Sequence, residues 1–270
     1  MEKYKKMVEG MAAISNPRID KDKTALVCID LVNDGSDDNG VFKKFLNYDI
    51  SLIQEIEPNV VKLVNTSKKA GIPVIGVQTI YDFDYITAPM KERFEAMGIK
   101  GGLAPKGAWG SEIIPKIKNL GLDLILVKSH YSAFSPEKTF AYKPGNQEIE
   151  EYMKLPASED SKLKAAGKRT MLDFFGDAKL NKNELTSLDS YLKSKGIDTL
   201  IITGASTHVC VDSTVAAASE RGYKLYEPID GVAAEGIPGE GFDRHYTYMS
   251  NHGMFKSELT TSKKLLEKLI

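Results

Sequence analysis

Residues 196–231 read GIDTLIITGASTHVCVDSTVAAASERGYKLYEPIDG, and this stretch indicates the class of fold. Two short runs in it, Thr199–Thr203 and Tyr223–Ile229, are rich in apolar and β-branched residues, as strands of a parallel sheet are when both its faces are covered. Between them, Val209–Arg221 has the pattern of a helix that ends at Gly222. A strand, a helix, a glycine and a second strand in this order are typical of an α/β protein.

The same alternation runs through the rest of the chain. Further strand-like runs lie at Thr24–Leu31, Ile72–Thr79 and Leu122–Val127, and further helix patterns lie at Leu52–Ala70 and Leu185–Lys195. Repeated units of this kind predict a doubly wound α/β domain, in which a mostly parallel sheet lies between two layers of helices. The expected fold class is therefore a Rossmann-like, three-layer α/β/α architecture.

Length and charge narrow the class of protein further. A chain of 270 residues can form one large domain or two small ones, and we expect a single domain over residues 1–270. Its 36 Lys and Arg against 37 Asp and Glu give a formal net charge of −1, and no basic stripe interleaved with aromatic residues is evident. Because this balance does not attract a polyanion, we expect no nucleic-acid partner.

The N-terminal sequence and the cysteine count bear on the compartment. Glu9 and Gly10 interrupt the apolar stretch that a signal peptide or membrane anchor would need, and no later window approaches the roughly 18 apolar residues of a spanning helix. Two cysteines, Cys28 and Cys210, are too few for a disulfide framework and suggest a reducing compartment. We therefore expect a cytoplasmic protein with no membrane partner.

Two segments stand outside the alternation of strands and helices. Residues 1–20 look like an N-terminal helical arm. Residues from about 135 to 173 are polar and charged, contain several Pro and Gly, and are longer than an ordinary connection. We interpret this segment as an insertion that either folds partly as a lid or forms a peripheral or oligomer-contacting excursion.

Chemically capable residues follow three of the predicted strands. In an open parallel sheet, ligands bind outside the carboxyl ends of the strands. Asp30 lies near the end of the first strand, Lys128 lies at the end of LDLILV, and Cys210 comes just after TLIITGAS. Cys210 also sits at the expected start of a helix, whose dipole depresses the pKa of a thiol. Asp30 and Lys128 could supply the proton acceptor and the counter-charge that a nucleophilic thiolate needs.

Each of these residues also has an ordinary structural explanation. Cys210 could be a small buried hydrophobe, Asp30 a turn or cap residue, and Lys128 a solvated charge at a strand end. Cys28 lies mid-strand in a continuous apolar run, which favours core packing. The histidines show no pairing typical of metal ligands and are interpreted as polar or substrate-lining; they are His130, His208, His245 and His252.

A nucleotide-binding domain is a competing hypothesis for a doubly wound fold. The first strand leads into residues 30–40, which read DLVNDGSDDNG. This stretch is an acidic turn and has no G-x-G-x-x-G or Walker pattern. Such a turn would repel phosphate, so this hypothesis is disfavoured.

Four stretches together resemble a known family. TALVCIDLVND, GAWGSEIIPKI, DLILVKSHYSAF and residues 196–231 occur in the order typical of the isochorismatase-like cysteine hydrolase superfamily. The resemblance runs from about residue 22 to residue 256, apart from the 135–173 insertion, and its most specific block is GASTHVCVDST. It implies the isochorismatase-like hydrolase fold.

The resemblance implies a catalytic triad of Asp30, Lys128 and Cys210 that hydrolyses a carbon–nitrogen bond without a cofactor. Asp30 would take the thiol proton and later pass it to the departing amine, Cys210 would attack the carbonyl, and Lys128 would hold the ionised pair. A cis peptide bond would join Ala205 and Ser206, so that the amides of Ser206 and Cys210 face the developing oxyanion.

Departures from two subfamilies narrow the expected reaction. Relatives that cleave the vinyl ether of isochorismate lack the nucleophilic cysteine, whereas Cys210 is present here. Nicotinamidases carry an Asp and paired His metal site after the second strand, where this chain reads QTIYDFDYITAP with Asp82 and Asp84. We therefore predict no catalytic metal and a small amide, carbamoyl or ureido substrate, such as N-carbamoylsarcosine, ureidoacrylate or biuret. The alternatives are a nicotinamidase-type amidase and a catalytically silent relative that serves as a binding protein.

Substrate contacts and assembly are the least specific expectations. Many such substrates carry a carboxylate, for which an Arg is the best partner, and Arg93 and Arg169 are candidates. Trp109 and Tyr131 could form an apolar wall, and Thr207 lies in the turn before the nucleophile. The resemblance also implies a homodimer or homotetramer.

Overall fold

The computed structural model describes residues 2–238 and 240–270. In the described part of the chain, eight strands form one sheet in the order β10-β8-β7-β1-β2-β5-β6, with β9 paired to β7. Their bounds are β1 Thr24–Ile29, β2 Val74–Thr79, β5 Leu124–Lys128, β6 Thr139–Tyr142, β7 Thr199–Ala205, β8 Lys224–Pro228, β9 Val232–Ala233 and β10 Glu258–Thr260. All pairs are parallel except β5 with β6. A small antiparallel pair joins β3 (Tyr81–Asp82) to β4 (Gly102–Leu103).

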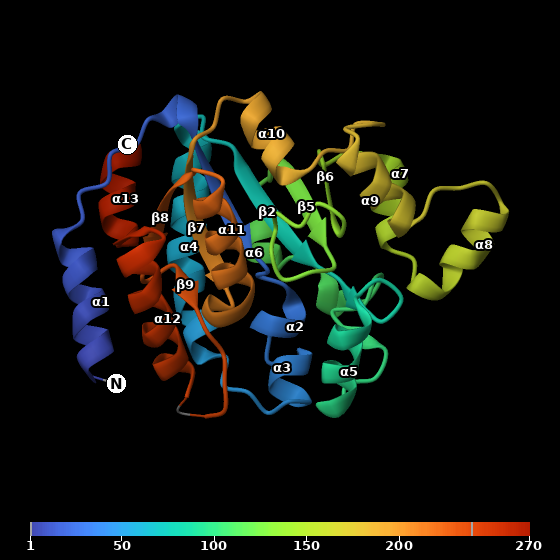
Figure 1. Cartoon of the computed structure of the whole chain (residues 1–270), viewed down its shortest axis with the longest axis horizontal. Coiled ribbons are helices and arrows are strands. Elements are labelled where there is room, and N and C mark those ends of the chain that lie inside the picture. Colours follow the sequence, from blue (N-terminus) through green and yellow to red (C-terminus); the bar gives the residue numbers. More distant parts are fainter. Residues whose placement is uncertain (1, 239) are drawn as a thin grey trace.

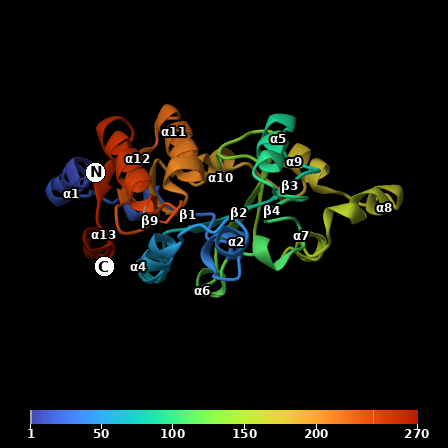
Figure 2. The ribbon, with the colours of Figure 1, turned by 90° about the horizontal axis from the view of Figure 1, so that it is seen from below.

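Helices cover both faces of the main sheet (Figure 1). Figure 2 shows α10, α11 and α12 on one side of it and α4, α6 and α13 on the other. The α-helices are α1 Glu2–Ile14, α2 Asn33–Ser36, α3 Val41–Lys44, α4 Ser51–Lys69, α5 Ala88–Ala96, α6 Pro115–Lys118, α7 Gln147–Met153, α8 Asp160–Ala165, α9 Met171–Lys179, α10 Leu188–Ser194, α11 Asp212–Glu220, α12 Gly241–Phe255 and α13 Ser262–Leu269. This arrangement confirms the predicted three-layer α/β/α class. Within the residues described, no helix is both long and apolar enough to cross a membrane.

The central strand β1 explains why its sequence is a continuous apolar run. All six of its residues are buried between β2 and β7. Leu26 and Cys28 pack into the core on the α4 side, while Ala25, Val27 and Ile29 pack into the core on the α11 side. Both faces of the strand are therefore covered. Cys28 is a core residue, as predicted, and burial raises the pKa of its thiol to about 11.

Two element boundaries differ from the predicted ones for identifiable reasons. β2 begins at Val74 rather than Ile72, because Pro73 has no N–H to donate to a neighbouring strand. The helix predicted from Val209 opens instead with a π-helical turn, Thr207–Val211, which leads directly into α11.

The predicted N-terminal arm forms α1, and this helix packs on the body of the protein. Val8 and Ala12 are buried, and α1 lies against α12 and β10. Lys264 at the start of α13 donates hydrogen bonds to the carbonyl oxygens of Ala12, Ala13 and Ser15 at the end of the arm. The end of the arm is thereby joined to α13, which lies next to α1 at one side of the molecule (Figure 1).

The segment 135–173, predicted to be an insertion, is only partly peripheral. Its first part forms β6, which pairs antiparallel with β5 and belongs to the main sheet. The chain then forms α7 and α8, and α8 protrudes at the end of the molecule farthest from α1 (Figure 1). The sequence pattern missed β6 because it is four residues long and lies between Pro136 and Pro144.

Candidate active site

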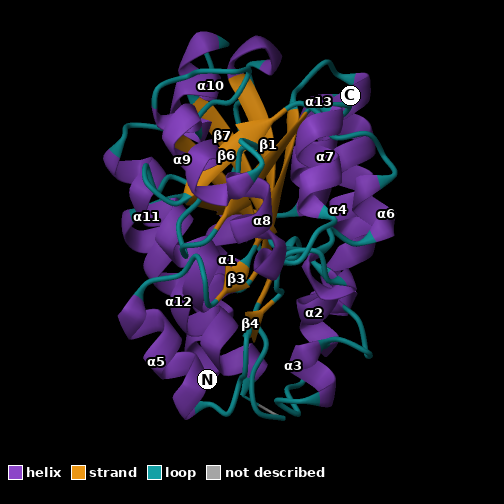
Figure 3. Cartoon of the chain, turned by 90° about the vertical axis from the view of Figure 1, so that its right-hand side faces the viewer, coloured by secondary structure: helices purple, strands orange, loops and turns teal. Residues whose placement is uncertain are grey.

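The carboxyl ends of β1, β5 and β7 carry the three residues that the sequence predicted to be catalytic. Asp30 directly follows β1, Lys128 is the last residue of β5, and Cys210 lies in the π-helical turn after β7. At this end of the sheet Figure 3 also shows α2, α3, β3 and β4. The three side chains meet, since Lys128 Nζ is 2.7 Å from Asp30 Oδ2 and 3.3 Å from Cys210 Sγ.

Lys128 is a buried ammonium at the centre of this group. Its side chain has no exposed surface, and Nζ also donates to the carbonyl oxygen of His130 and the hydroxyl of Tyr81, both at 3.0 Å. Burial lowers its pKa, but its interactions with Asp30 and Cys210 together raise it by more, so the net shift is upward. Lys128 is therefore not the solvated strand-end charge of the alternative interpretation.

The thiol of Cys210 does not have the depressed pKa that its place at a helix start predicts. Burial raises its pKa to about 12, Lys128 lowers it, and the nearby charge of Asp30 raises it. The sequence-based expectation was wrong because desolvation of a thiolate outweighs the attraction of the helix terminus. The sulfur is a neutral thiol at rest, and ionising it requires a base.

Asp30 is placed to be that base. Its backbone lies in the left-handed region, with φ of 47°, and turns the chain from β1 toward α2. Burial raises the pKa of its carboxyl, while Lys128 lowers it. Apart from its contacts with Lys128 and with the Cys210 thiol, which both lower its pKa, the Asp30 carboxylate has no hydrogen-bond partner among the described residues. The carboxylate therefore has lone pairs free to accept the Cys210 proton.

Tyr81 is a fourth member of this group that the sequence analysis did not identify. Its hydroxyl lies 3.1 Å from Cys210 Sγ and 3.0 Å from Lys128 Nζ. Tyr81 is the first residue of β3, two residues after the end of β2, so its position at the same edge of the sheet was the available signal. A tyrosine at this position has no distinctive spacing that marks it as part of a site.

The turn before Cys210 depends on one glycine and one cis peptide bond. Gly204 has φ of 112°, and a Cβ there would lie 2.0 Å from the carbonyl oxygen of Ile29, so only glycine fits. The Ala205–Ser206 peptide bond is cis, as the family resemblance implied. The hydroxyl of Ser206 donates to the buried carboxylate of Glu235, which fixes the side chain beside Cys210.

A pocket with an empty volume of about 420 Å³, its mouth included, opens onto Cys210 and Asp30. Thr79 and Tyr81 line it from the end of β2, and Ala205 and Ser206 line it from the end of β7. Apolar side chains form much of the remaining wall; they are Val32, Phe42, Ile53 and Leu103. The same pocket contains a carboxylate from α2, that of Asp34.

None of the five residues predicted to contact the substrate is among the described residues that line this pocket. Trp109 is 48% exposed, and Arg93 is exposed in the last turn of α5. Tyr131 packs edge-on against Tyr81 with ring centroids 5.9 Å apart. Thr207 is buried, with its hydroxyl 3.0 Å from His245 Nδ1.

The other predicted polar candidates also have structural partners. Arg169 forms ion pairs with Glu148 and Asp177, so it is not free to clamp a carboxylate. His252 lies between Glu227 and Asp212, at 3.0 Å from each. No group of three or more His, Cys, Asp or Glu side chains arranged to hold a metal ion occurs within residues 2–238 and 240–270.

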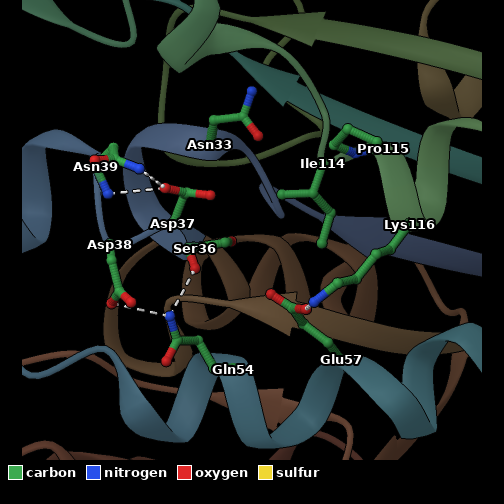
Figure 4. Close-up of a pocket in the computed structure, with 10 residues that line it drawn as sticks. All are labelled: Asn33, Ser36, Asp37, Asp38, Asn39, Gln54, Glu57, Ile114, Pro115 and Lys116. Carbon is green, nitrogen blue, oxygen red and sulfur yellow. Dashed lines mark hydrogen bonds and ion pairs between the residues drawn. The ribbon is translucent and has the colours of Figure 1, made fainter.

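A second pocket lies beside α2 and is lined by polar side chains that pair with one another (Figure 4). Asn39 donates two hydrogen bonds to Asp37, Gln54 bridges the Ser36 carbonyl oxygen and Asp38, and Lys116 pairs with Glu57. These contacts attach the loop after α2 to α4, while the buried hydroxyl of Ser36 has no hydrogen-bond partner among the described residues. We interpret this pocket as a support for the α2 segment.

Comparison with protein families identifies the chain. The family described as "Isochorismatase domain" matches residues 24–153 and 169–251, and both parts include residues of the site. The chain belongs to this family. The part of this isochorismatase domain that the match leaves out, residues 154–168, contains α8 and lies within the predicted insertion.

Individual relatives of this isochorismatase domain are distant. The ureidoacrylate amidohydrolase RutB of Acinetobacter baylyi is 23% identical over 206 residues, which cover 72% of this chain and 64% of that protein. RutB of Serratia proteamaculans is 24% identical over 208 residues, which cover 72% of this chain and 62% of that protein. The chain thus matches less than two thirds of the length of these two relatives.

Solved structures share the fold. A cysteine hydrolase from Pseudomonas syringae pv. phaseolicola superposes with a TM-score of 0.63 at 19% identity, over 93% of this chain and 94% of that one. N-carbamoylsarcosine amidase from Thermoplasma acidophilum superposes with a TM-score of 0.52 at 22% identity, over 89% and 96%. At these identities the likeness supports the fold alone.

Proposed function

We propose that this isochorismatase domain is a cysteine-dependent amidohydrolase that cleaves the C–N bond of a small amide, carbamoyl or ureido compound. The observation that carries the proposal is the contact of one buried ammonium, Lys128 Nζ, with both the Asp30 carboxylate and the Cys210 sulfur. A thiol, a base and a fixed counter-charge at the mouth of one pocket are the parts that nucleophilic attack on a carbonyl requires. The names of the relatives, ureidoacrylate amidohydrolase and N-carbamoylsarcosine amidase, agree with this class of reaction.

In the first half-reaction, Asp30 takes the proton of Cys210 as the sulfur attacks the carbonyl carbon. The carbonyl π bond opens to an oxyanion, which the backbone N–H groups of Ser206 and Cys210 would receive. When the oxyanion collapses, the C–N bond breaks, and Asp30 returns its proton to the departing nitrogen. The products are ammonia or an amine and a thioester on Cys210.

In the second half-reaction, water attacks the thioester carbonyl while Asp30 takes a proton from that water. Collapse of this second oxyanion breaks the C–S bond, and the proton restores the Cys210 thiol. Lys128 stays protonated throughout, since its contacts with Asp30 and Cys210 raise its pKa. Its charge stabilises the carboxylate before proton transfer and the thiolate after it.

Tyr81 contributes to the same ionisation. Its hydroxyl is 3.1 Å from Cys210 Sγ and can donate a hydrogen bond to the thiolate. Because a hydrogen bond to a charged group in a buried site is stronger than one to a neutral group, the contact favours the thiolate over the thiol.

The test is ammonia release from a panel of small amides and ureides that includes nicotinamide, N-carbamoyl amino acids, ureidoacrylate, biuret and maleamate. The Cys210→Ala variant is the blank, and each reaction is repeated with a chelator. Release that is lost in the variant and unaffected by the chelator supports the proposal, and intact mass should then reveal a substrate-derived adduct on Cys210 under rapid quench.

Two other results would redirect the proposal. Release only from nicotinamide would identify a nicotinamidase-type amidase. If neither wild type nor the Cys210→Ala variant releases ammonia from any compound of the panel, the result would favour the alternative of a catalytically silent binding protein.

A further inference from the structure

The active-site pocket contains a second carboxylate that the triad does not use. Asp34 lies in α2, is 6% exposed, and lines the same pocket as Cys210. Its Oδ1 accepts a hydrogen bond from the backbone N–H of Val41 at 3.3 Å, and its Oδ2 accepts one from the backbone N–H of Ala104 at 3.0 Å. Burial, the largest effect, raises the pKa of the Asp34 carboxyl, and these two donors lower it and so favour the ionised form against that burial.

The carboxylate of Asp34 is held in one place by the surrounding backbone. Gly110 approaches so closely that a Cβ there would lie 2.2 Å from Asp34 Oδ1. The loop after α2 is in turn attached to α4 by the hydrogen bonds of Asp38 and Ser36 with Gln54 (Figure 4). A carboxylate oxygen that accepts one backbone hydrogen bond still has a free lone pair, so each Asp34 oxygen can accept another N–H.

The charges around the pocket are predominantly negative. Asp30 and Asp34 both line it, and the carboxylate of Glu235 lies directly behind Ser206. The ammonium of Lys128 is in contact with Asp30 at 2.7 Å, so most of its charge is already balanced. In a pocket whose remaining wall is largely apolar, a like charge on a ligand is weakly screened and strongly disfavoured.

We propose that Asp34 accepts hydrogen bonds from the N–H groups of the substrate, and that this enzyme selects amides or ureides without a carboxylate near the scissile bond. The inference rests on the proposed amidohydrolase function and names its substrate class. Ureidoacrylate and N-carbamoylsarcosine, the compounds in the names of two relatives, both carry a carboxylate. This chain would therefore differ from those relatives in the charge of the compound it accepts.

The test compares matched pairs of substrates that differ by one group. Maleamide and maleamate, and likewise succinamide and succinamate, share a carbon skeleton and a carboxamide but exchange a second carboxamide for a carboxylate. We expect wild-type enzyme to show a kcat/KM at least about tenfold higher for the diamide of each reactive pair. The comparison uses unmodified enzyme and so does not depend on a variant that folds.

The Asp34→Asn variant assigns the preference to one residue. It keeps the size of the side chain and removes its charge, so we expect kcat/KM to fall for the diamide, to rise for the half-amide, and their ratio to approach one. Asp37→Asn is the matched control, because Asp37 is a nearby carboxylate that lines the second pocket instead. The control should keep the wild-type ratio, and circular dichroism should verify that both variants are folded.

The outcomes separate the two proposals. If wild-type enzyme cleaves the half-amides as well as or better than the diamides, the substrate class is wrong while the amidohydrolase function stands. If the diamide is preferred and Asp34→Asn, folded, keeps that preference, Asp34 is not the residue responsible. If these pairs and the wider panel of amides and ureides all remain intact with wild-type enzyme, the proposed function fails and the inference fails with it.

Discussion

Cys210 and Cys28 are both buried thiols, but they have different neighbours. Cys28 packs in the core and has the hydroxyl of Thr203 at 3.5 Å, whereas Cys210 contacts an ammonium and a tyrosine hydroxyl. Burial raises the pKa of both thiols, to about 11 and about 12. The reactivity that we propose for Cys210 must therefore come from proton transfer within the site and not from a thiolate that is present at rest.

This distinction predicts how Cys210 reacts with an alkylating reagent. In a Cys28→Ser background, the rate of modification of resting enzyme by iodoacetamide should rise roughly tenfold per pH unit between pH 7 and 10, because the thiolate is a small fraction throughout. Mass spectrometry of the peptide that contains Cys210 gives the rate. A plateau near pH 7 would show that the resting thiol is already ionised.

Tyr81→Phe removes one hydroxyl next to the sulfur and leaves the ring in place. A hydrogen bond to a charged group contributes about 1.5–3 kcal/mol, so we expect kcat/KM to fall by roughly one to two orders of magnitude with little change in KM. The alkylation rate of Cys210 should fall as well, which a purely packing role for Tyr81 would not cause. Tyr85→Phe, which removes a hydroxyl that binds Asp160, is the control for the loss of a buried tyrosine OH.

The convergence of Asp30, Lys128 and Cys210 could be predicted from sequence because the ends of the long strands could be predicted. Asp30, Lys128 and Cys210 each follow an apolar run, and the carboxyl ends of parallel strands converge at one edge. Asp34 and Tyr81 were not identified, since a carboxylate in an acidic turn and a tyrosine after a strand have no distinctive spacing. The position of Asp34 depends on the path of the chain through α2, β4 and Trp109–Ser111, which local pattern does not specify.

At the scale of elements, the long buried strands were predicted well. Short strands that form only by pairing with a neighbouring strand were not predicted. β1 and β7 have continuous apolar sequences and were located within two residues. β6 and β9 are four and two residues long, and they form strands because a neighbouring strand is already in place to pair with them. The π-helical turn at Thr207–Val211 likewise depends on the packing around Cys210.

Asp160 makes the polar contacts that attach α8 to the rest of the protein, and Leu163 of the same helix packs against the core. Asp160 accepts hydrogen bonds from the hydroxyls of Tyr85 and Tyr152 and pairs with the buried ammonium of Lys106 at 3.4 Å. Asp160 belongs to residues 154–168, the part outside the family match, while Tyr85 and Lys106 lie within it. This cluster therefore links the protruding segment to the part of the chain that matches the family.

Asp160→Ala should loosen that segment. It leaves the Lys106 ammonium buried without its carboxylate partner, so we expect a loss of about 2–3 kcal/mol in the free energy of unfolding. Limited proteolysis should also cleave residues 154–168 faster than in wild type. Glu159→Ala, which removes an exposed partner of Lys162, should change neither quantity measurably. Equal cleavage of the Asp160 variant and wild type would show that other contacts hold α8.

At the scale of the whole molecule, a buried ion cluster joins α11, β8 and α12. His252 in α12 contacts Glu227 of β8 and Asp212 of α11, and Lys256 also contacts Asp212. Burial lowers the pKa of His252, but the negative charge of Glu227 and the hydrogen bonds to both carboxylates raise it to about 9. The imidazole is thus protonated in the folded protein at neutral pH.

This cluster predicts a pH dependence of global stability. The folded pKa of His252 exceeds its unfolded value of about 6.5, so its contribution is fully present below pH 6.5 and is lost as pH rises through about 9. Wild type should exceed His252→Gln by about 3 kcal/mol in the free energy of unfolding at pH 6, and the difference should shrink by pH 9.5. Urea denaturation at both pH values measures it, and a difference that does not change with pH would contradict the assignment.

The short strand β6 also bears on how this chain could have diverged from its relatives. Ala141 in β6 pairs with Thr186 through two backbone hydrogen bonds, so the chain leaves the sheet after Tyr142 and returns to the same place 44 residues later, at Thr186. Residues can be added or removed between these points without shifting the register of β5, which carries Lys128. Lineages of this family are therefore expected to vary in length here while their chemistry is inherited unchanged, and a new surface can evolve beside an old catalytic centre.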